Sequence, residues 1–174
     1  SPPASELTLS GDPYSANVSL LLRGNTYSVK EESNNNFIIY EFGNHAKISD
    51  SNFKYGGSSL TFYGYDGDYL SLDSSLNSYF DFGTGDFTIE FWIYFNSGAV
   101  ASRILIDWRP SGTDGVYPTI YTGATGLVAY YVSSADRITS AAALSATTWT
   151  HIAVARSGTS TKMFVNGTQI GSTY

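Results

Sequence analysis

Glu90 is the residue whose type and position first suggest catalysis. It lies in residues 87–95, where apolar and polar residues alternate, so its carboxylate would project from one face of an extended strand. Hydrolysis of a glycosidic bond needs a second carboxylate across the bond from the first. Thr88 and Trp92 occupy the positions two residues away on the same face. The sequence therefore does not favour a glycosidase, and we expect no enzymatic activity.

The two histidines, His45 and His151, complete no other catalytic arrangement. A nucleophilic triad needs a nucleophile, a base and an orienting group held together, and no Gly-x-Ser-x-Gly turn presents a serine. His151 lies beside Trp149 within an alternating stretch, where a packed strand histidine is the simpler interpretation. The chain has no cysteine, which excludes thiol nucleophiles, disulfides and thiolate metal sites.

Aromatic side chains are abundant enough to form a binding surface, with 14 Tyr, 10 Phe and 3 Trp in 174 residues. Exposed rings beside Asp, Asn or Arg could act as stacking platforms for a carbohydrate, although most aromatic residues of a β-sandwich belong to the core or the sheet surface. The residues available for glycan contact are Trp92, Tyr94, Trp108, Tyr117 and Tyr121, together with Tyr130 and Tyr131.

The distribution of charge argues against a nucleic acid partner. The formal net charge is −6, and the nine basic residues are scattered, so they provide no basic stripe for a nucleic acid backbone. No run of 18 apolar residues occurs, so we expect no membrane span. The length suits one domain.

The candidate residues lie on short segments in which apolar and polar residues alternate, as is typical of β-strands. In residues 87–95 every second side chain is apolar, and residues 149–156 place Thr150, Ile152 and Val154 on one side. With 17 glycines, frequent Ser, Asn and Asp clusters and no long 3.6-residue period, the chain is predicted to be all-β. If the apolar face of 87–95 is interior, replacing Phe91 with alanine should cost about 3–5 kcal/mol.

Other segments give more local predictions. Asn166-Gly167 is the strongest hairpin signal, because both central residues of a type I′ turn need a positive φ. Residues 103–108 are predicted as a strand with Ile104, Ile106 and Trp108 on one face. Residues 141–143 are the one candidate for a helical turn.

Four segments resemble one known family. They are DPYSANVSLLLRG (12–24), YGGSSLTFYGYDGDYLSLD (55–73), FGTGDFTIEFWIYF (82–95) and WTHIAVARSGTSTKMFVNGTQIGS (149–172). They are similar to laminin G-like, concanavalin A-like jelly-roll domains, especially those of phage and cyanophage virion proteins such as fibres and decoration proteins, and those of bacterial surface proteins. The resemblance implies a jelly-roll β-sandwich of two antiparallel sheets.

The resemblance also carries functional expectations. It implies a non-enzymatic structural or adhesion module of a virion, such as a capsid decoration or fibre protein, or alternatively a lectin-like module that binds host or surface glycans. The location would be the phage particle, or else the bacterial cell surface or extracellular space. Glycosidases of this superfamily carry an E-x-D-x-x-E pattern, which does not occur around Glu90.

Calcium is the one metal that the resemblance implies, since laminin G-like domains often hold one and hard cations take carboxylate and carbonyl oxygens. The candidate ligands are Asp66, Asp68 and Asp107, with Asp114 as an alternative to the last. A simpler interpretation is that Asp66 and Asp68 are turn residues that bind loop amides. No other cofactor is expected.

Residues 1–13 are predicted to form an extended arm, and residues 14–174 the jelly-roll domain. Within it, residues 18–22 are predicted as the first core strand. The resemblance implies a closing strand that pairs with it, and this strand either is lacking or belongs to a longer natural protein that continues past Tyr174. Because an open strand edge attracts another chain, we expect a neighbouring subunit or the arm to cover it, which implies an oligomer or a particle-bound protein. The predicted contact residues are Glu6, Leu7, Thr8, Leu9, Val18, Leu20 and Leu22.

Overall fold

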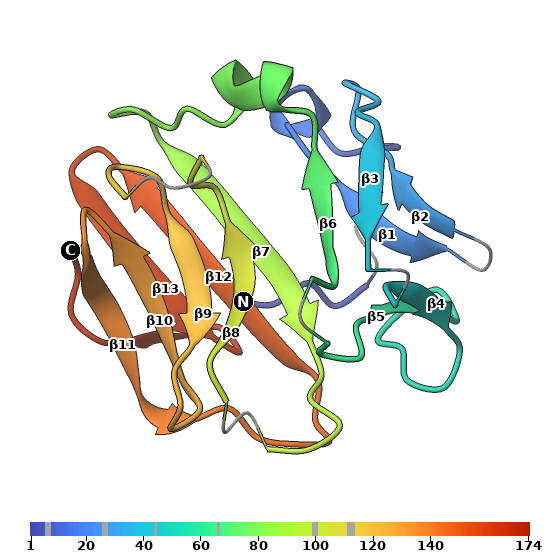
Figure 1. Cartoon of the computed structure of the whole chain (residues 1–174). Coiled ribbons are helices and arrows are strands. Elements are labelled where there is room, and N and C mark those ends of the chain that lie inside the picture. Colours follow the sequence, from blue (N-terminus) through green and yellow to red (C-terminus); the bar gives the residue numbers. More distant parts are fainter. Residues whose placement is uncertain (6–7, 26–27, 44, 66, 99–100, 111–113) are drawn as a thin grey trace. The chain divides into compact units, whose positions relative to one another are not determined.

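The structure is a computed structural model that describes residues 1–5, 8–25, 28–43, 45–65, 67–98, 101–110 and 114–174. The predicted all-β class is confirmed, because the regular structure consists of antiparallel strands and two short 3-10 helices. The chain divides into two compact units (Figure 1). The larger unit comprises Ser1–Pro2 and Phe80–Tyr174, and the smaller unit comprises Pro3–Tyr79.

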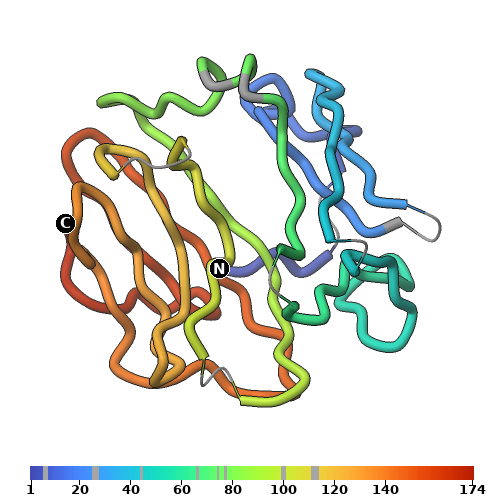
Figure 2. The backbone as a smooth tube through the Cα atoms, viewed as in Figure 1, coloured from blue at the N-terminus to red at the C-terminus, as the bar shows by residue number. Residues whose placement is uncertain are grey.

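The larger unit contains two antiparallel sheets of four strands each, which form two layers in Figure 2. The first has the order β11-β10-β9-β8. Its strands are β8 (Arg103–Asp107), β9 (Thr119–Thr122), β10 (Leu127–Val132) and β11 (Ala135–Ala143). The second has the order β14-β13-β12-β7. Its strands are β7 (Phe87–Ile93), β12 (Thr150–Ser157), β13 (Ser160–Val165) and β14 (Thr168–Ile170).

One apolar core joins the two sheets. Its buried members are Ile89, Ile120, Val128, Tyr130, Val132, Ile138, Leu144, Ile152, Val154 and Met163. The predicted interior face of residues 87–95 is confirmed, since Ile89 is buried and the other apolar residues of that face pack against the cluster. Alternation along each strand thus places one side of each sheet in the core and leaves the other side for contacts.

The predicted Asn166-Gly167 hairpin joins β13 to β14. Both residues have a positive φ, 50° for Asn166 and 80° for Gly167, as a type I′ turn requires. A Cβ on Gly167 would lie 2.8 Å from Cδ of Pro2 and 3.3 Å from Cα of Ser1. The first two residues of the chain therefore pack directly on this turn.

Gly167→Ala is expected to destabilise the chain more than Gly158→Ala. Both glycines have a positive φ, but a Cβ on Gly158 would meet nothing within 4 Å. Gly158→Ala should cost only the left-handed strain of about 1–2 kcal/mol, whereas Gly167→Ala adds a clash with the rigid Pro2 ring. Urea denaturation measures both, and deletion of residues 1–5 should remove most of the difference. Equal costs in the full chain would contradict the packing of Pro2 on the turn.

A second turn, residues 82–85, is held by Arg156 of β12. The Arg156 Nε donates to the carbonyl of Gly85 at 2.7 Å, and its Nη2 donates to the carbonyls of Phe82 at 2.8 Å, Gly83 at 3.0 Å and Gly85. The guanidinium lies 4.9 Å from the ring centroid of Phe87. One side chain thus fixes the chain just before it enters β7.

Two local predictions about the larger unit are wrong. Residues 141–143 are the end of β11 and not a helical turn. In β8 the pairing with β9 shifts between Ile104 and Ile106, and this β-bulge turns the two side chains to opposite faces. Ile104 is accordingly 60% exposed, while Ile106 packs against the core.

The smaller unit consists of three antiparallel strand pairs. They are β1 (Leu22–Asn25) with β2 (Ser28–Glu31), β3 (Ile39–Phe42) with β6 (Tyr69–Leu72), and β4 (Lys47–Ser49) with β5 (Ser59–Thr61). The short helices η1 (Ser15–Asn17) and η2 (Ser74–Tyr79) flank them. The Glu31 carboxylate accepts hydrogen bonds from the amides of Leu21, Ser33 and Phe37. Burial alone would raise the pKa of Glu31, but these bonds lower it.

The prediction of an opening strand over residues 18–22 is wrong in its bounds. Only Leu22 belongs to a strand, β1, and it pairs with Glu31 of β2. Val18 caps the C-terminal end of the 3-10 helix Ser15–Asn17, and its backbone N–H bonds to the carbonyl of Ser15 instead of to a neighbouring strand. Val18 and Leu20 are half-buried, and Leu22 is 40% exposed.

The arm and the covered edge remain predictions. Thr8 is exposed and Leu9 half-buried, while Glu6 and Leu7 lie outside the described residues. The hydroxyl of Tyr55 donates to the carbonyl of Pro3 at 2.6 Å, so the chain near Pro3 contacts the smaller unit. An oligomer or particle-bound state is tested below.

Candidate functional site

A polar row crosses the outer face of the β8–β11 sheet. Asp107 pairs with Thr119, Thr119 with Tyr131, and Tyr131 with Asp136. Because Ile120, next to Thr119, lies in the core, the row lies on the opposite face of the sheet. Four side chains from four strands are therefore neighbours on one surface.

Tyr121 lies on the same face as this row, two residues after Thr119 in β9. Its hydroxyl donates to the Asp136 carboxylate, whose two oxygens are each 2.9 Å away. Tyr121 belongs to β9 and Asp136 to β11, two strand spacings or roughly 10 Å apart. On β10, between these strands, Tyr121 pairs with Ala129 and Asp136 pairs with Tyr131. The half-buried side chain of Tyr121 therefore reaches across β10 to Asp136. Burial raises the pKa of Tyr121, and Asp136 raises it further.

Arg109 closes one end of the row. Its Nε and Nη2 donate to the two oxygens of Asp107 at 2.9 and 2.8 Å, and its Nη1 donates to Asp114 at 3.0 Å. The guanidinium lies 5.6 Å from the ring centroid of Tyr131. Such a two-point fork fixes both groups more firmly than a single ion pair would.

The charges of this fork are stable at neutral pH. Burial alone would raise the pKa of Asp107, but hydrogen bonds from Arg109 and Thr119 hold it below its usual value. The hydrogen bonds to Asp107 raise the pKa of Arg109 above its usual value. The outer face thus carries the Tyr121 ring bonded to Asp136 and the Tyr131 ring beside the fixed Arg109–Asp107 pair.

The other aromatic candidates from the sequence are not gathered at this site. Trp92 of β7 lies 5.1 Å from His151 between ring centroids. Tyr94, which follows β7, lies 5.5 Å from Trp149 between ring centroids. Trp108 stacks on Phe80 at 4.5 Å and packs against the core. Tyr117 is half-buried before β9, and Tyr130 is buried in the core.

Glu90 faces a histidine and not a second carboxylate. Its Oε2 lies 3.2 Å from Nε2 of His151 on the outer face of β7 and β12. The backbone N–H of His151 donates to the side chain of Asn166 at 2.9 Å. His151 is 3% exposed; burial lowers its pKa, although Glu90 acts in the opposite direction. The arrangement lacks the paired carboxylates that glycoside hydrolysis uses.

We expect the stability of the chain to fall as the pH falls below about 6.5, the ordinary histidine pKa. The pKa of His151 is lower in the folded state, so the unfolded chain takes up the proton first and gains stability from it. Urea midpoints measured from pH 8 to pH 5 should therefore decrease, and His151→Gln should flatten this part of the profile. A wild-type stability that rises from pH 8 to pH 6 would contradict the assigned direction.

The calcium candidates do not form a cluster among the described residues. Asp66 lies outside them. Asp68 is buried, with Oδ1 2.9 Å from Nδ1 of His45 and Oδ2 without a hydrogen-bond partner. Asp107 is bound by Arg109, and Asp114 contacts the same guanidinium. In the described part of the chain no three His, Asp or Glu side chains come together as metal ligands.

Calcium takes six to eight oxygen ligands, so these residues do not fit a calcium site. A guanidinium already neutralises Asp107, and an imidazole occupies one oxygen of Asp68. Asp68 does keep one buried oxygen that accepts nothing from the described residues. Calcium binding stays a prediction of the resemblance. The sugar-binding measurements described below are therefore made both with calcium and with EDTA.

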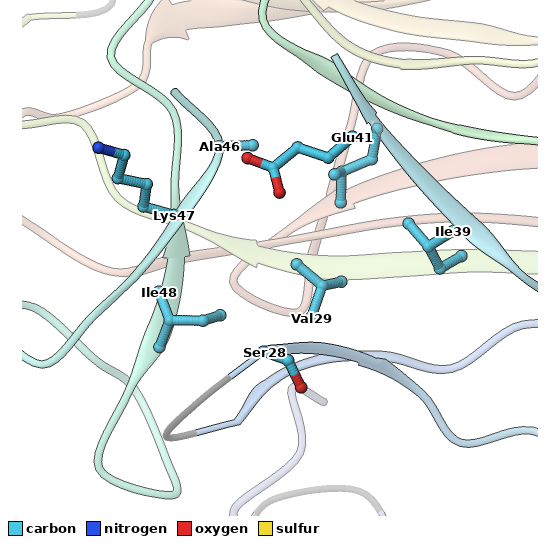
Figure 3. Close-up of a pocket in the computed structure, with 8 residues that line it drawn as sticks. Ser28, Val29, Ile39, Glu41, Ala46, Lys47 and Ile48 are labelled. Carbon is cyan, nitrogen blue, oxygen red and sulfur yellow. The ribbon is translucent and has the colours of Figure 1, made fainter. Parts of the chain in front are cut away.

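A hollow in the smaller unit contains none of the sequence candidates. Its volume is about 620 Å³, and the Glu41 carboxylate projects into it (Figure 3). Most of its lining is aliphatic. The residues are Ser28, Val29, Ile39, Glu41, Ala46, Lys47, Ile48 and Leu70. Without an aromatic platform or paired titratable groups, this hollow is less suited to sugar contact than the outer face of β8–β11.

Two antiparallel sheets around one core, with polar and aromatic residues on the outer faces, define the larger unit as a jelly-roll β-sandwich. Residues 64–174 match the sequence model of the concanavalin A-like lectin/glucanases superfamily. The chain belongs to this superfamily, and the laminin G-like resemblance is confirmed at that level. The match supports no virion protein in particular.

Comparison with solved structures finds the crystal structure of an S-layer domain-containing protein (residues 221–444) from Clostridium thermocellum ATCC 27405. The sequence identity is 24% and the TM-score 0.47, with 85% of this chain covered. The match spans 65% of that chain's length. A search of curated proteins finds no match. Among the described residues, no helix has the length and apolar character needed to cross a membrane.

Proposed function

We propose that this chain is a non-enzymatic adhesion module that binds a glycan on the outer face of the β8–β11 sheet. The superfamily includes lectins by name, and the observation that carries the proposal is the half-buried Tyr121 ring, whose hydroxyl is fixed by Asp136 across β10. A flat, half-buried ring offers stacking area at little cost in side-chain order, and neighbouring polar groups orient the ligand.

The arrangement around Glu90 supports the non-enzymatic part of the proposal. The superfamily also includes glucanases by name, but Glu90 pairs with His151. Glu90 also lies on the β7–β12 sheet, whereas Tyr121 lies on the other sheet of the sandwich. A catalytic carboxylate must lie within hydrogen-bond reach of the bond that it protonates, so a sugar held on Tyr121 would not meet Glu90.

A glycan array tests the proposal, with Glu90→Gln as a matched control. Wild type and Glu90→Gln should bind the same glycans with the same affinity, and neither should release reducing ends. Tyr121→Ala should weaken binding at least about tenfold, which corresponds to about 1.4 kcal/mol. Absence of binding to every glycan at high protein concentration would refute the proposal. Cleavage of any glycan that is lost in Glu90→Gln would establish an enzyme.

A second candidate is a structural module of a virion or a cell-surface assembly that acts through protein contacts. The observation that favours it is an aromatic patch on β3 and β6, formed by Tyr40, Phe42 and Tyr69, which are 42%, 42% and 49% exposed. Phe42 and Tyr69 are cross-strand partners and stack at 4.6 Å. Exposed apolar patches mark protein interaction sites.

Light scattering distinguishes this candidate from a monomeric lectin. An oligomer that dissociates in Phe42→Ser but persists in Tyr121→Ala would support a protein contact through the aromatic patch. Copurification of the chain with phage particles or with bacterial surface layers would then identify the assembly. A monomer at all concentrations that copurifies with neither would exclude this candidate.

A further inference from the structure

We infer that the glycan bound on the β8–β11 face is neutral and that its binding requires no calcium. The inference rests on the proposed function and adds the chemical class of the ligand. It follows from how the charged groups around Tyr121 are already paired.

The charges near Tyr121 disfavour an anionic sugar. Asp107 and Asp114 pair with one guanidinium, Arg109, and Asp136 accepts the Tyr121 hydroxyl, so these three carboxylates and one guanidinium give the site a net charge of −2. All three donor nitrogens of Arg109 are engaged by Asp107 and Asp114. The charge of this guanidinium is thus already neutralised by Asp107 and Asp114, and it offers no unpaired positive charge to the carboxylate of a uronic or sialic acid.

Two further cations of the same sheet are directed elsewhere. Arg137 donates to the carbonyls of Val132 and Ser133 at 3.1 Å each, and its guanidinium lies 5.0 Å from the ring centroid of Tyr174. Arg103 donates to the carbonyl of its neighbour Ser102 at 3.0 Å. A sugar carboxylate on Tyr121 would thus meet the net negative charge of the site, and like charges at an interface weaken binding.

A neutral sugar fits the groups that are present. Ile104 is the register partner of Tyr121 and is 60% exposed, so the apolar surface continues from the ring toward β8. Beyond the ring lies Asp136, whose oxygens keep lone pairs for sugar hydroxyls after accepting the Tyr121 bond. From β8 to β11 this strip spans about 14 Å, or three strand spacings. It therefore suits a short oligosaccharide better than one sugar unit.

The same pairing makes calcium unnecessary. A cation that bridges protein and sugar needs carboxylate oxygens, but the oxygens of Asp107 accept hydrogen bonds from Arg109 and Thr119. Those of Asp136 face the Tyr121 hydroxyl. The acceptors are thus held in place by protein donors and can bind hydroxyls directly.

Matched oligosaccharide pairs test the inference. The probes are the tetrasaccharides of 1,4-linked glucose, mannose and galactose and the corresponding tetra-uronic acids, which differ only in the oxidation of C6. Isothermal titration is performed with 1 mM calcium and with EDTA. We expect at least one neutral member to bind at least about tenfold more tightly than its uronic acid, with the same affinity in calcium and in EDTA.

Three variants connect this preference to the site. Tyr121→Ala should abolish measurable binding, and Tyr121→Phe should keep the ring but lose a few-fold in affinity because the bond to Asp136 is gone. Asp136→Asn should narrow the difference between the neutral and acidic members of a pair. The urea midpoint of each variant checks that it folds, and Tyr121→Phe remains informative if Tyr121→Ala does not fold.

Each result has a definite consequence. Binding that prefers uronic acids, or that EDTA abolishes, overturns the inference and leaves the proposed glycan binding in place. Binding that survives unchanged in folded Tyr121→Ala shows that the site is elsewhere and also overturns the inference. If neither these probes nor any glycan of the array binds, the proposed function itself fails.

Discussion

Replacing Ile152 with alanine is expected to lower the free energy of unfolding by about 2–5 kcal/mol. Ile152 is completely buried at 0% exposure, and it lies in the middle of its sheet, paired with Phe91 of β7 and Val165 of β13. Removing its branched side chain leaves a cavity that the surrounding strands cannot close by moving. Urea denaturation followed by tryptophan fluorescence measures the loss.

Lys162→Ala serves as the control for this core variant. Lys162 is exposed on β13 of the same sheet, so its replacement should change stability by less than about 0.5 kcal/mol. The sequence alone assigned the larger cost to Phe91, on the assumption that its ring is fully interior. Phe91 is only half-buried, so we now expect Phe91→Ala to cost less than a fully buried Phe would. If Ile152→Ala cost under about 1 kcal/mol, the assigned core would be wrong.

The sandwich core was predictable because alternation decides it. On β7 every second residue is apolar, and on β12 Ile152 and Val154 alternate in the same way, so a shift of one residue would turn these side chains toward solvent. The hairpin at Asn166 and Gly167 was predictable for a similar local reason, since few residue pairs accept two positive φ values. Both features depend only on residues that are close together in the sequence.

The candidate site was less predictable because it depends on register between strands. Tyr121 was a candidate among many tyrosines, but its partner Asp136 is 15 residues away, and only the pairing of β9, β10 and β11 brings them together. The bulge that exposes Ile104 breaks the alternation that sequence reasoning assumes. Arg109 was missed, although its position between Asp107 and Asp114 in sequence was a usable signal.

The smaller unit was the least predictable part of the chain. The apolar run at residues 18–22 has the composition of a strand, yet the ladder starts only at Leu22. The three strand pairs there contain only three or four residues per strand, and such short segments show too few alternations to fix a register. Side-chain caps such as Glu31, which bind loop amides, define this unit more than hydrophobic periodicity does.

Arg156→Ala is expected to lower the free energy of unfolding by about 2 kcal/mol. Its guanidinium donates to the carbonyls of Phe82, Gly83 and Gly85, and hydrogen bonds from charged donors typically contribute about 1.5–3 kcal/mol. The low end of that range applies because these carbonyls can bind water once Arg156 is removed. Arg156→Lys should recover little, because an ammonium group cannot span three carbonyls as the planar fork does.

The loss of stability in Arg156→Ala should be greatest near residues 82–85, because Arg156 holds the turn that leads into β7. Amide hydrogen exchange at residues 85–88 should accelerate in Arg156→Ala more than exchange at residues 152–154 in the core. Arg103→Ala is the matched control, because Arg103 is exposed and, in the described part of the chain, donates to the carbonyl of its neighbour Ser102. It should leave stability and exchange unchanged. If Arg156→Ala and Arg103→Ala behaved alike, the hydrogen bonds to residues 82–85 would not stabilise the fold, and β7 would be positioned by core packing alone.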